Sequence, residues 1–131
     1  QQNPATGRDI HNEPAPQLNI EKVCEACGVN DVAVVDPFDL KATEKALRDA
    51  TAREEVSVVI ARRPCALLDK TAYKPYVIEG CKNCGACMKL SCPAIERQEK
   101  SVRINPALCI GCGMCAQVCP FKAIKSGEEA Q

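Results

Sequence analysis

Residues 81–93 read CKNCGACMKLSCP, and residues 109–120 read CIGCGMCAQVCP. In each run, three cysteines are separated from one another by two residues, and a fourth cysteine directly precedes a proline. The second run has the ligand spacing of bacterial two-cluster ferredoxins, and the first differs by one inserted residue before Cys92. Eight thiolates in this order predict two [4Fe–4S] clusters, which proteins hold mainly to move single electrons.

The fourth cysteine of each run serves the other cluster in two-cluster ferredoxins. On that pattern, cluster one has the ligands Cys81, Cys84, Cys87 and Cys119, and cluster two has the ligands Cys109, Cys112, Cys115 and Cys92. The residue inserted before Cys92 then lengthens the connection between the clusters. It leaves each three-cysteine wrap unchanged.

Small residues and prolines fit this prediction. Gly85, Gly111 and Gly113 lie between ligands, where the backbone must curl tightly around a cluster and positive φ angles are expected. The curl turns backbone N–H groups toward sulfur atoms and so tunes the reduction potential. Pro93 and Pro120 end each run by stopping the local helix.

Zinc and disulfides are the alternatives. Cys-x-x-Cys pairs also bind tetrahedral zinc, but two consecutive triplets that each end in Cys-Pro are a poor zinc pattern. The chain has 11 cysteines, an odd number, and their spacing is that of a metal site in a reducing compartment. We therefore expect bound clusters and a cytoplasmic location.

Composition narrows the function further. Seventeen basic and 17 acidic residues give a net charge of zero, and two clusters with their thiolates would add roughly four negative charges. This charge and only 3% aromatic residues give no sign of nucleic-acid binding. The longest apolar runs, such as residues 56–61, are too short to span a membrane, and no signal peptide is visible. The first residue is Gln1 rather than methionine, which favours a piece of a longer protein.

The N-terminal half predicts one βαβ unit. Asn19 is expected to cap a helix that Gly28 ends, with Ile20, Val23, Cys24 and Cys27 on one apolar face. Residues 32–35 and 56–61 are expected to be buried parallel strands. Between them, Asp39 is expected to cap a helix with a Glu44–Arg48 pair outside its buried stripe. About 45 residues are few for an independent domain, so the unit is expected to complete a larger α/β sheet.

Three cysteines and two arginines outside the two cysteine runs are further candidates for a functional site. Cys24 and Cys27 lie at the end of the first helix, where the dipole disfavours a thiolate, so we interpret them as core residues rather than a redox or metal pair. Cys65 could join them at a third metal site, but a fourth ligand is lacking. Arg62 and Arg63 follow a strand at the edge where α/β sheets bind ligands, so they are either anion or domain contacts or a solvated basic turn.

The C-terminal half predicts a small cluster domain after a linker at residues 66–76. Residues 76–78 should pair with 123–125, residues 95–98 and 102–104 should form a hairpin, and residues 87–90 and 114–118 should be short helices. A charged, frayed tail should start at Lys125. An apolar jacket around the clusters is expected from Ile78, Leu90, Ile95, Ile104, Leu108, Ile110, Val118 and Ile124.

Residues 26–29 (ACGV), 34–40 (VVDPFDL) and 60–65 (IARRPC), followed directly by the cysteine runs, resemble the C-terminal end of the large (alpha) subunit of indolepyruvate:ferredoxin oxidoreductases. Residues 3–7 (NPATG) resemble the loop after the thiamine-diphosphate site of that family. The resemblance implies an α+β chain in which residues 1–70 are the C-terminal portion of a thiamine-diphosphate-binding α/β domain. Residues 71–131 would be the two-[4Fe–4S] ferredoxin domain.

The resemblance also implies a function. Such enzymes decarboxylate a 2-oxoacid, typically an aryl pyruvate, on thiamine diphosphate with Mg²⁺ and pass the acyl group to coenzyme A. The electrons leave through clusters to an external ferredoxin. Partners would be the remainder of the large subunit and a smaller second subunit. The family's GDG-type motif is absent here, so we expect no catalytic residue in this chain. The alternative is a free-standing two-cluster electron carrier with an N-terminal docking extension.

Overall fold

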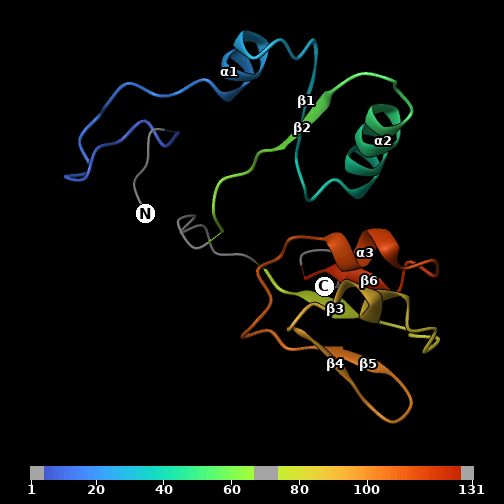
Figure 1. Cartoon of the computed structure of the whole chain (residues 1–131). Helices are drawn as coiled ribbons and strands as arrows, with labels where there is room; N and C mark the ends of the chain where they lie inside the picture. Colours follow the sequence, from blue (N-terminus) through green and yellow to red (C-terminus); the bar gives the residue numbers. More distant parts are fainter. Residues whose placement is uncertain (1–4, 67–73, 128–131) are drawn as a thin grey trace. The chain divides into compact units, whose positions relative to one another are not determined.

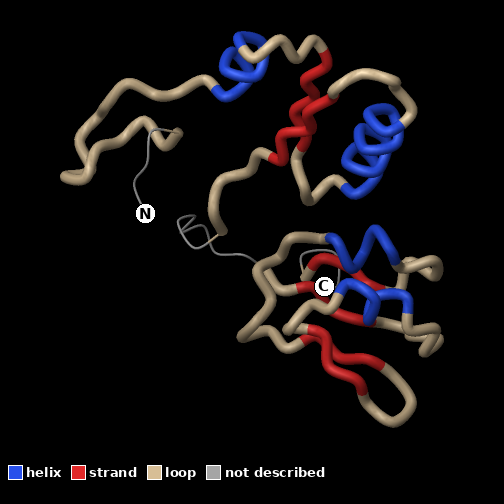
Figure 2. The backbone as a smooth tube through the Cα atoms, in the orientation of Figure 1, coloured by secondary structure: helices blue, strands red, loops and turns tan. Residues whose placement is uncertain are grey.

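The computed structural model describes residues 5–66 and 74–127. The chain divides into two compact units, one made of residues up to Asp36 together with Lys41–Arg62, and one made of Pro37–Leu40 and the chain from Arg63 onward. Both units contain helices and strands, so the chain is α+β as predicted (Figures 1 and 2). The predicted boundary at residues 70 and 71 lies outside the described residues. So do Asn3 and Pro4 of the NPATG stretch, most of the predicted linker, and the end of the predicted tail.

The first helix, α1 (Ile20–Ala26), forms as its capping residues predict. The side chain of Asn19 accepts a hydrogen bond from the Lys22 N–H at 2.8 Å. At the other end, the N–H groups of Gly28 and Val29 bond the carbonyls of Glu25 and Cys24, and Gly28 has a φ of 86°. These paired bonds form a Schellman motif, in which a left-handed glycine ends the helix.

The predicted βαβ order is confirmed. Strands β1 (Asp31–Val35) and β2 (Ser57–Ala61) pair in parallel, with Val32 opposite Val58 and Val34 opposite Ile60. Helix α2 (Leu40–Thr51) lies between them in the sequence, and its predicted pair is present, with Arg48 2.7 Å from Glu44.

The predicted burial of this unit is wrong. Among its described residues none is buried, and Val34 in β1 is 45% exposed. Cys27, predicted as a core residue, is exposed and Cys24 is only half-buried. Parallel strands are normally covered by helices on both faces, and this unit contributes two strands and two short helices. The apolar periodicity is therefore present, but the unit has too few helices and strands of its own to cover its apolar faces.

The second unit contains two antiparallel strand pairs and two short helices. Strand β3 (Tyr76–Ile78) pairs with β6 (Ile124–Ser126), one residue later than predicted. The predicted hairpin is confirmed as β4 (Ile95–Arg97) and β5 (Val102–Ile104). The short helices are the 3₁₀ helix η1 (Ala86–Leu90) and the α-helix α3 (Met114–Val118).

All the buried residues among those described belong to this second unit. They are Cys87, Ala94, Ile95, Val102, Ile104, Gly113, Cys115, Ala123 and Ile124. Most of the predicted apolar jacket lies here, and Leu108 and Ile110 also line the hollow that contains Cys109, although their outer sides leave them 51% and 40% exposed. Val102 was missed, although it alternates with Ile104 on the inward face of β5.

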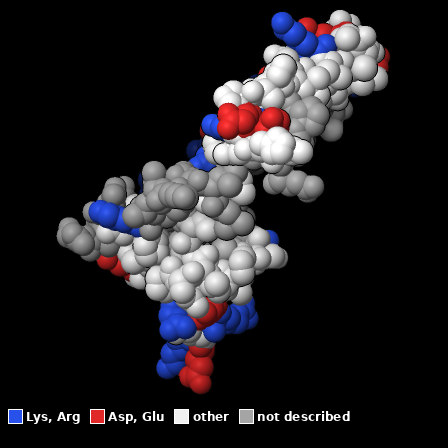
Figure 3. All heavy atoms as spheres, turned by 90° about the vertical axis from the view of Figure 1, so that its left-hand side faces the viewer, with Lys and Arg blue, Asp and Glu red and all other residues white. Residues whose placement is uncertain are grey.

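Charged side chains of this unit gather at the β4–β5 hairpin, at the bottom of the view in Figure 3, below a largely uncharged surface. Within the described ranges, no helix is long and apolar enough to cross a membrane.

Candidate metal centre

The structure brings the eight cysteines of the two runs together as two groups of four. In the first group, Cys81 and Cys84 lie in the loop after β3, Cys87 lies in η1, and Cys119 ends α3. All four line one small hollow, together with Ile78, Val102 and Ile124. We call this the first site. Cys119 comes from the second cysteine run, as the exchange of fourth cysteines requires.

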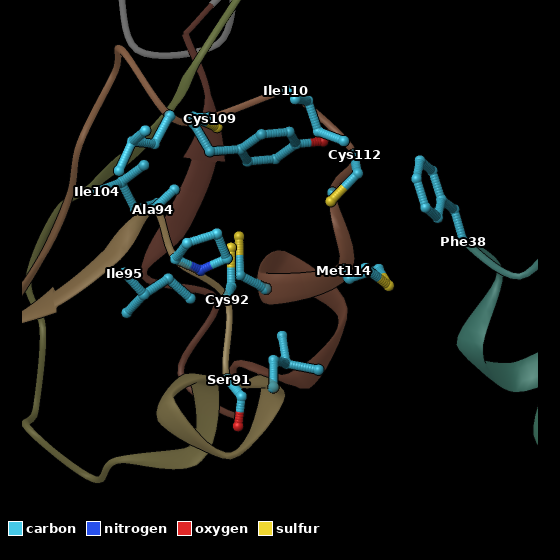
Figure 4. A pocket seen from close by; sticks show the side chains of 16 residues that line it. Phe38, Ser91, Cys92, Ala94, Ile95, Ile104, Cys109, Ile110, Cys112 and Met114 are labelled. Carbon is cyan, nitrogen blue, oxygen red and sulfur yellow. The ribbon is translucent and has the colours of Figure 1, made fainter. Parts of the chain in front are cut away.

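The second site is a hollow of about 330 Å³ lined by Cys92, Cys109, Cys112 and Cys115. Figure 4 shows Cys92 and Cys112 reaching into it from opposite walls, with Ala94, Ile95 and Ile104 beside them. Here Cys92 comes from the first cysteine run. No residue that lines this hollow carries a charge.

The thiols within each group influence one another electrostatically. Burial raises the pKa of the Cys87 thiol, and negative charge on Cys81, Cys84 and Cys119 adds to this. In the second site, burial and then the charges of Cys112, Cys109 and Cys92 raise the pKa of Cys115 to about 11. Without metal, these two buried thiols therefore stay protonated at neutral pH, and metal binding must displace their protons.

Backbone geometry at the wraps follows from their glycines. Gly85 and Gly113 directly precede η1 and α3, with φ of 73° and 74°, and Gly111 also has a positive φ of 68°. A side chain at 113 would also meet the Tyr76 hydroxyl, because an ideal Cβ there lies 2.8 Å from Tyr76 Oη. This contact between Tyr76 and the loop at Gly113 was not predicted, because the sequence does not show which loop Tyr76 in β3 faces.

Two backbone N–H groups point at sulfur atoms of the first site. Asn83 donates to Cys81 Sγ and Ala123 donates to Cys119 Sγ, each at 3.3 Å. In the second site, the Ala116 N–H is directed at Cys115 and lowers its pKa in part. These donors fit thiolate sulfur, which accepts hydrogen bonds when it binds iron.

Each donor set consists of four thiols, which are the ligands that a [4Fe–4S] cluster takes. Within residues 5–66 and 74–127, no three His, Cys, Asp or Glu side chains converge closely enough to hold one metal ion. Tetrahedral zinc would need sulfur atoms about 3.8 Å apart, from its bond length of ~2.3 Å. A cube spreads its four thiolates, because each binds a different iron. The first hollow measures only about 20 Å³, so its thiols must separate for a cube to enter, which the exposed Cys84 permits.

The remaining predicted candidates form no site in the described residues. Cys65 is exposed, and Cys24 and Cys27 have no third metal-binding side chain near them. Arg62 forms a two-pronged ion pair with Glu21, with both N···O distances 2.7 Å. The hydrogen bond from Arg62 lowers the pKa of Glu21 to about 2. Arg63 lies over the Phe38 ring, 4.2 Å from its centroid. Both arginines are exposed, as a solvated turn predicts, and both have partners within the chain.

Two hollows that each contain four cysteines are the arrangement expected of a ferredoxin-like iron–sulfur domain. In agreement, residues 102–125 match the family model described as "4Fe-4S binding domain".

The chain is 40% identical over its whole length to "Indolepyruvate oxidoreductase subunit IorA" of Pyrococcus horikoshii, and 38% identical over 98% of its length to the subunit of that name from Archaeoglobus fulgidus. It spans 22% of each of these relatives. An uncharacterized ferredoxin of Methanocaldococcus jannaschii is 41% identical over 50% of this chain and 40% of its own length. No solved structure matches. The resemblance inferred from the sequence motifs is thus confirmed.

Proposed function

We propose that this chain is the electron-transfer part of a 2-oxoacid:ferredoxin oxidoreductase that acts on indolepyruvate or a related aryl pyruvate. The observation that carries the proposal is the reach of the similarity. Indolepyruvate oxidoreductase subunits match the N-terminal unit as well as the cysteine-rich unit, whereas the uncharacterized ferredoxin matches half of the chain. A free-standing carrier is therefore the less favoured alternative.

The proposed ligands follow the two hollows. Cys81, Cys84, Cys87 and Cys119 would hold cluster one, and Cys109, Cys112, Cys115 and Cys92 would hold cluster two. Their lining of separate hollows supports this assignment, and so does the raised pKa of Cys87 and of Cys115, to which the other three cysteines of each group contribute after burial. Each cluster supplies a one-electron couple when bound.

The chain's own residues prepare these sites. Gly85 and Gly113 allow the backbone to turn toward the ligands, and Asn83 and Ala123 donate hydrogen bonds to ligand sulfurs. Val102 and Ile124 wall the first site, while Ile95 and Ile104 wall the second. All four are buried, so they exclude water from the sulfurs and lower the local dielectric.

We further propose that the N-terminal unit is part of a thiamine-diphosphate-binding α/β domain. Its two parallel strands lack buried side chains, which suits strands that add to a larger sheet. Thiamine diphosphate, Mg²⁺ and coenzyme A would then be cofactors of the rest of the enzyme. A smaller second subunit and an external ferredoxin are the proposed partners. We place the chain in the cytoplasm, where a reducing environment keeps 11 cysteines as thiols.

The test uses the complete protein that carries this chain, produced anaerobically with its partner subunit. We expect indolepyruvate-dependent reduction of an added ferredoxin that requires thiamine diphosphate and coenzyme A. Pyruvate serves as the control substrate. Normal cluster content without any 2-oxoacid-dependent ferredoxin reduction would contradict the enzyme and favour the carrier.

A further inference from the structure

The two sites share a ligand pattern but differ in the charges around them. Lys82 lines the first site, between the ligands Cys81 and Cys84. Arg97 is the exposed last residue of β4 and lies on the same face of the strand as buried Ile95. Its Nη2 atom is 3.9 Å from the ideal Cβ position of Gly85, so the guanidinium reaches the Cys84–Gly85 turn.

Acidic groups near the first site do not cancel these two cations. Glu79 precedes the first run, and its carboxylate is paired with Lys125 at 2.7 Å. Glu96 is the strand neighbour of Arg97, points to the opposite face, and is paired with Arg103. The second site has no charged lining residue, and residues 105–118 contain no charged side chain at all.

We propose that Lys82 and Arg97 hold the reduction potential of the cluster at Cys81, Cys84, Cys87 and Cys119 above that of the cluster at Cys109, Cys112, Cys115 and Cys92. The inference rests on the ligand assignment proposed above. The physical reason is charge: reduction adds one negative charge to a cluster that is already negative, and nearby cations stabilise the more negative state.

Hydrogen bonding and exposure act in the same direction. Two N–H groups donate to sulfurs of the first site at 3.3 Å, and such bonds stabilise the reduced form. Cys84 is exposed, so water also screens the added charge there, whereas none of the second-site cysteines is exposed. At equilibrium, an electron shared between the sites therefore rests at the first site.

The experiment is a redox titration of the whole chain, loaded with iron and sulfide under anaerobic conditions. The NMR signals of the cysteine β-protons, assigned to each site, report which cluster is reduced at each applied potential. We expect the first-site signals to change from the oxidised to the reduced form at a less negative applied potential than the second-site signals. Arg97→Gln and Lys82→Gln should each lower the reduced-to-oxidised ratio of the first site about three- to tenfold at a fixed poise, where tenfold equals about 59 mV for one electron.

Lys100→Gln is the matched control, because Lys100 lies in the turn of the same hairpin and lines neither hollow. It should leave both ratios within about twofold. Equal potentials, the reverse order, or unchanged first-site ratios in both Arg97→Gln and Lys82→Gln would overturn the inference while leaving the proposed function intact. A chain that takes up no clusters would overturn the proposed function and this inference together.

Discussion

The two cysteine sites arise from nearly the same sequence pattern, yet their surroundings differ. The first is a narrow hollow with Lys82 at its wall and Arg97 nearby, and its Cys84 is exposed. The second is a larger hollow with uncharged walls, closed at Gly113 by Tyr76. Cysteine spacing thus decides which thiols come together, whereas the residues around them decide the local charge and dielectric.

The largest effect should come from removing a buried cysteine that we propose as a ligand of either site. Cys115→Ala should lose the second cluster and keep the first, so iron content should fall from about eight to about four atoms per chain. Cys87→Ala should do the reverse. Iron and sulfide analysis with EPR of the reduced protein measures both losses. Cys92→Ala should resemble Cys115→Ala, and unchanged iron in any of these variants would refute the ligand assignment.

A smaller difference should separate the two glycines that precede η1 and α3. Both have φ near 74°, so an alanine at either position costs about 1–2 kcal/mol of backbone strain. Gly113→Ala also forces Tyr76 to move, because the contact would be 2.8 Å, whereas the nearest atom to a Cβ at Gly85 is 3.9 Å away. We expect about 1 kcal/mol more destabilisation for Gly113→Ala.

Loss of visible absorbance in guanidinium measures this difference. Adding Tyr76→Phe to Gly113→Ala removes the clashing oxygen and should recover most of the extra cost, while it should not rescue Gly85→Ala. Equal destabilisation by Gly85→Ala and Gly113→Ala would show that the Tyr76 side chain moves aside without an energetic cost.

The smallest effect should be common to both sites. Arg103 and the Asn105 side chain hold the pKa of Glu96 below its usual range. A depressed carboxyl pKa stabilises the folded hairpin above the unfolded pKa, and this stabilisation is lost as pH falls through the folded value. Glu96→Gln should therefore slightly weaken the β4–β5 hairpin at pH 7 and match the wild type at acidic pH.

Amide hydrogen exchange in β4 and β5 measures this change, with Glu99→Gln as the control. The hairpin walls both sites, through Val102 in the first and Ile104 in the second. A loss of protection from amide exchange at the residues of only one site would contradict the inference that the hairpin supports both sites.

Several features could be predicted from sequence because they are local. The Asn19 cap and the Gly28 terminus mark α1 correctly, and the hairpin at residues 95–104 follows from two short apolar runs around a polar turn. The grouping of eight cysteines into two sets of four also agrees with the predicted exchange of fourth cysteines.

What failed was the prediction of burial. Periodicity shows which residues share a face, but not whether another element covers that face. Leu108 and Ile110 are neighbours of Cys109 that line the second hollow and are nevertheless partly exposed, and Val34 belongs to a strand that the first unit leaves partly open. The positions of Arg97 and Tyr76 beside the wraps depend on tertiary contacts between segments distant in sequence, which spacing does not encode.

The exchange of fourth cysteines has a consequence for folding cooperativity. On the proposed assignment, each cluster is a covalent cross-link between the two halves of the cysteine-rich unit, closing one loop from Cys81 to Cys119 and another from Cys92 to Cys115. Cross-links over such loops restrict the unfolded chain and, by the relation used for disulfides, each contributes about 3–4 kcal/mol. The loops are nested, so loss of iron from one site loosens the frame that holds the other, and a chain that has lost one cluster should unfold at a lower guanidinium concentration than the chain with both.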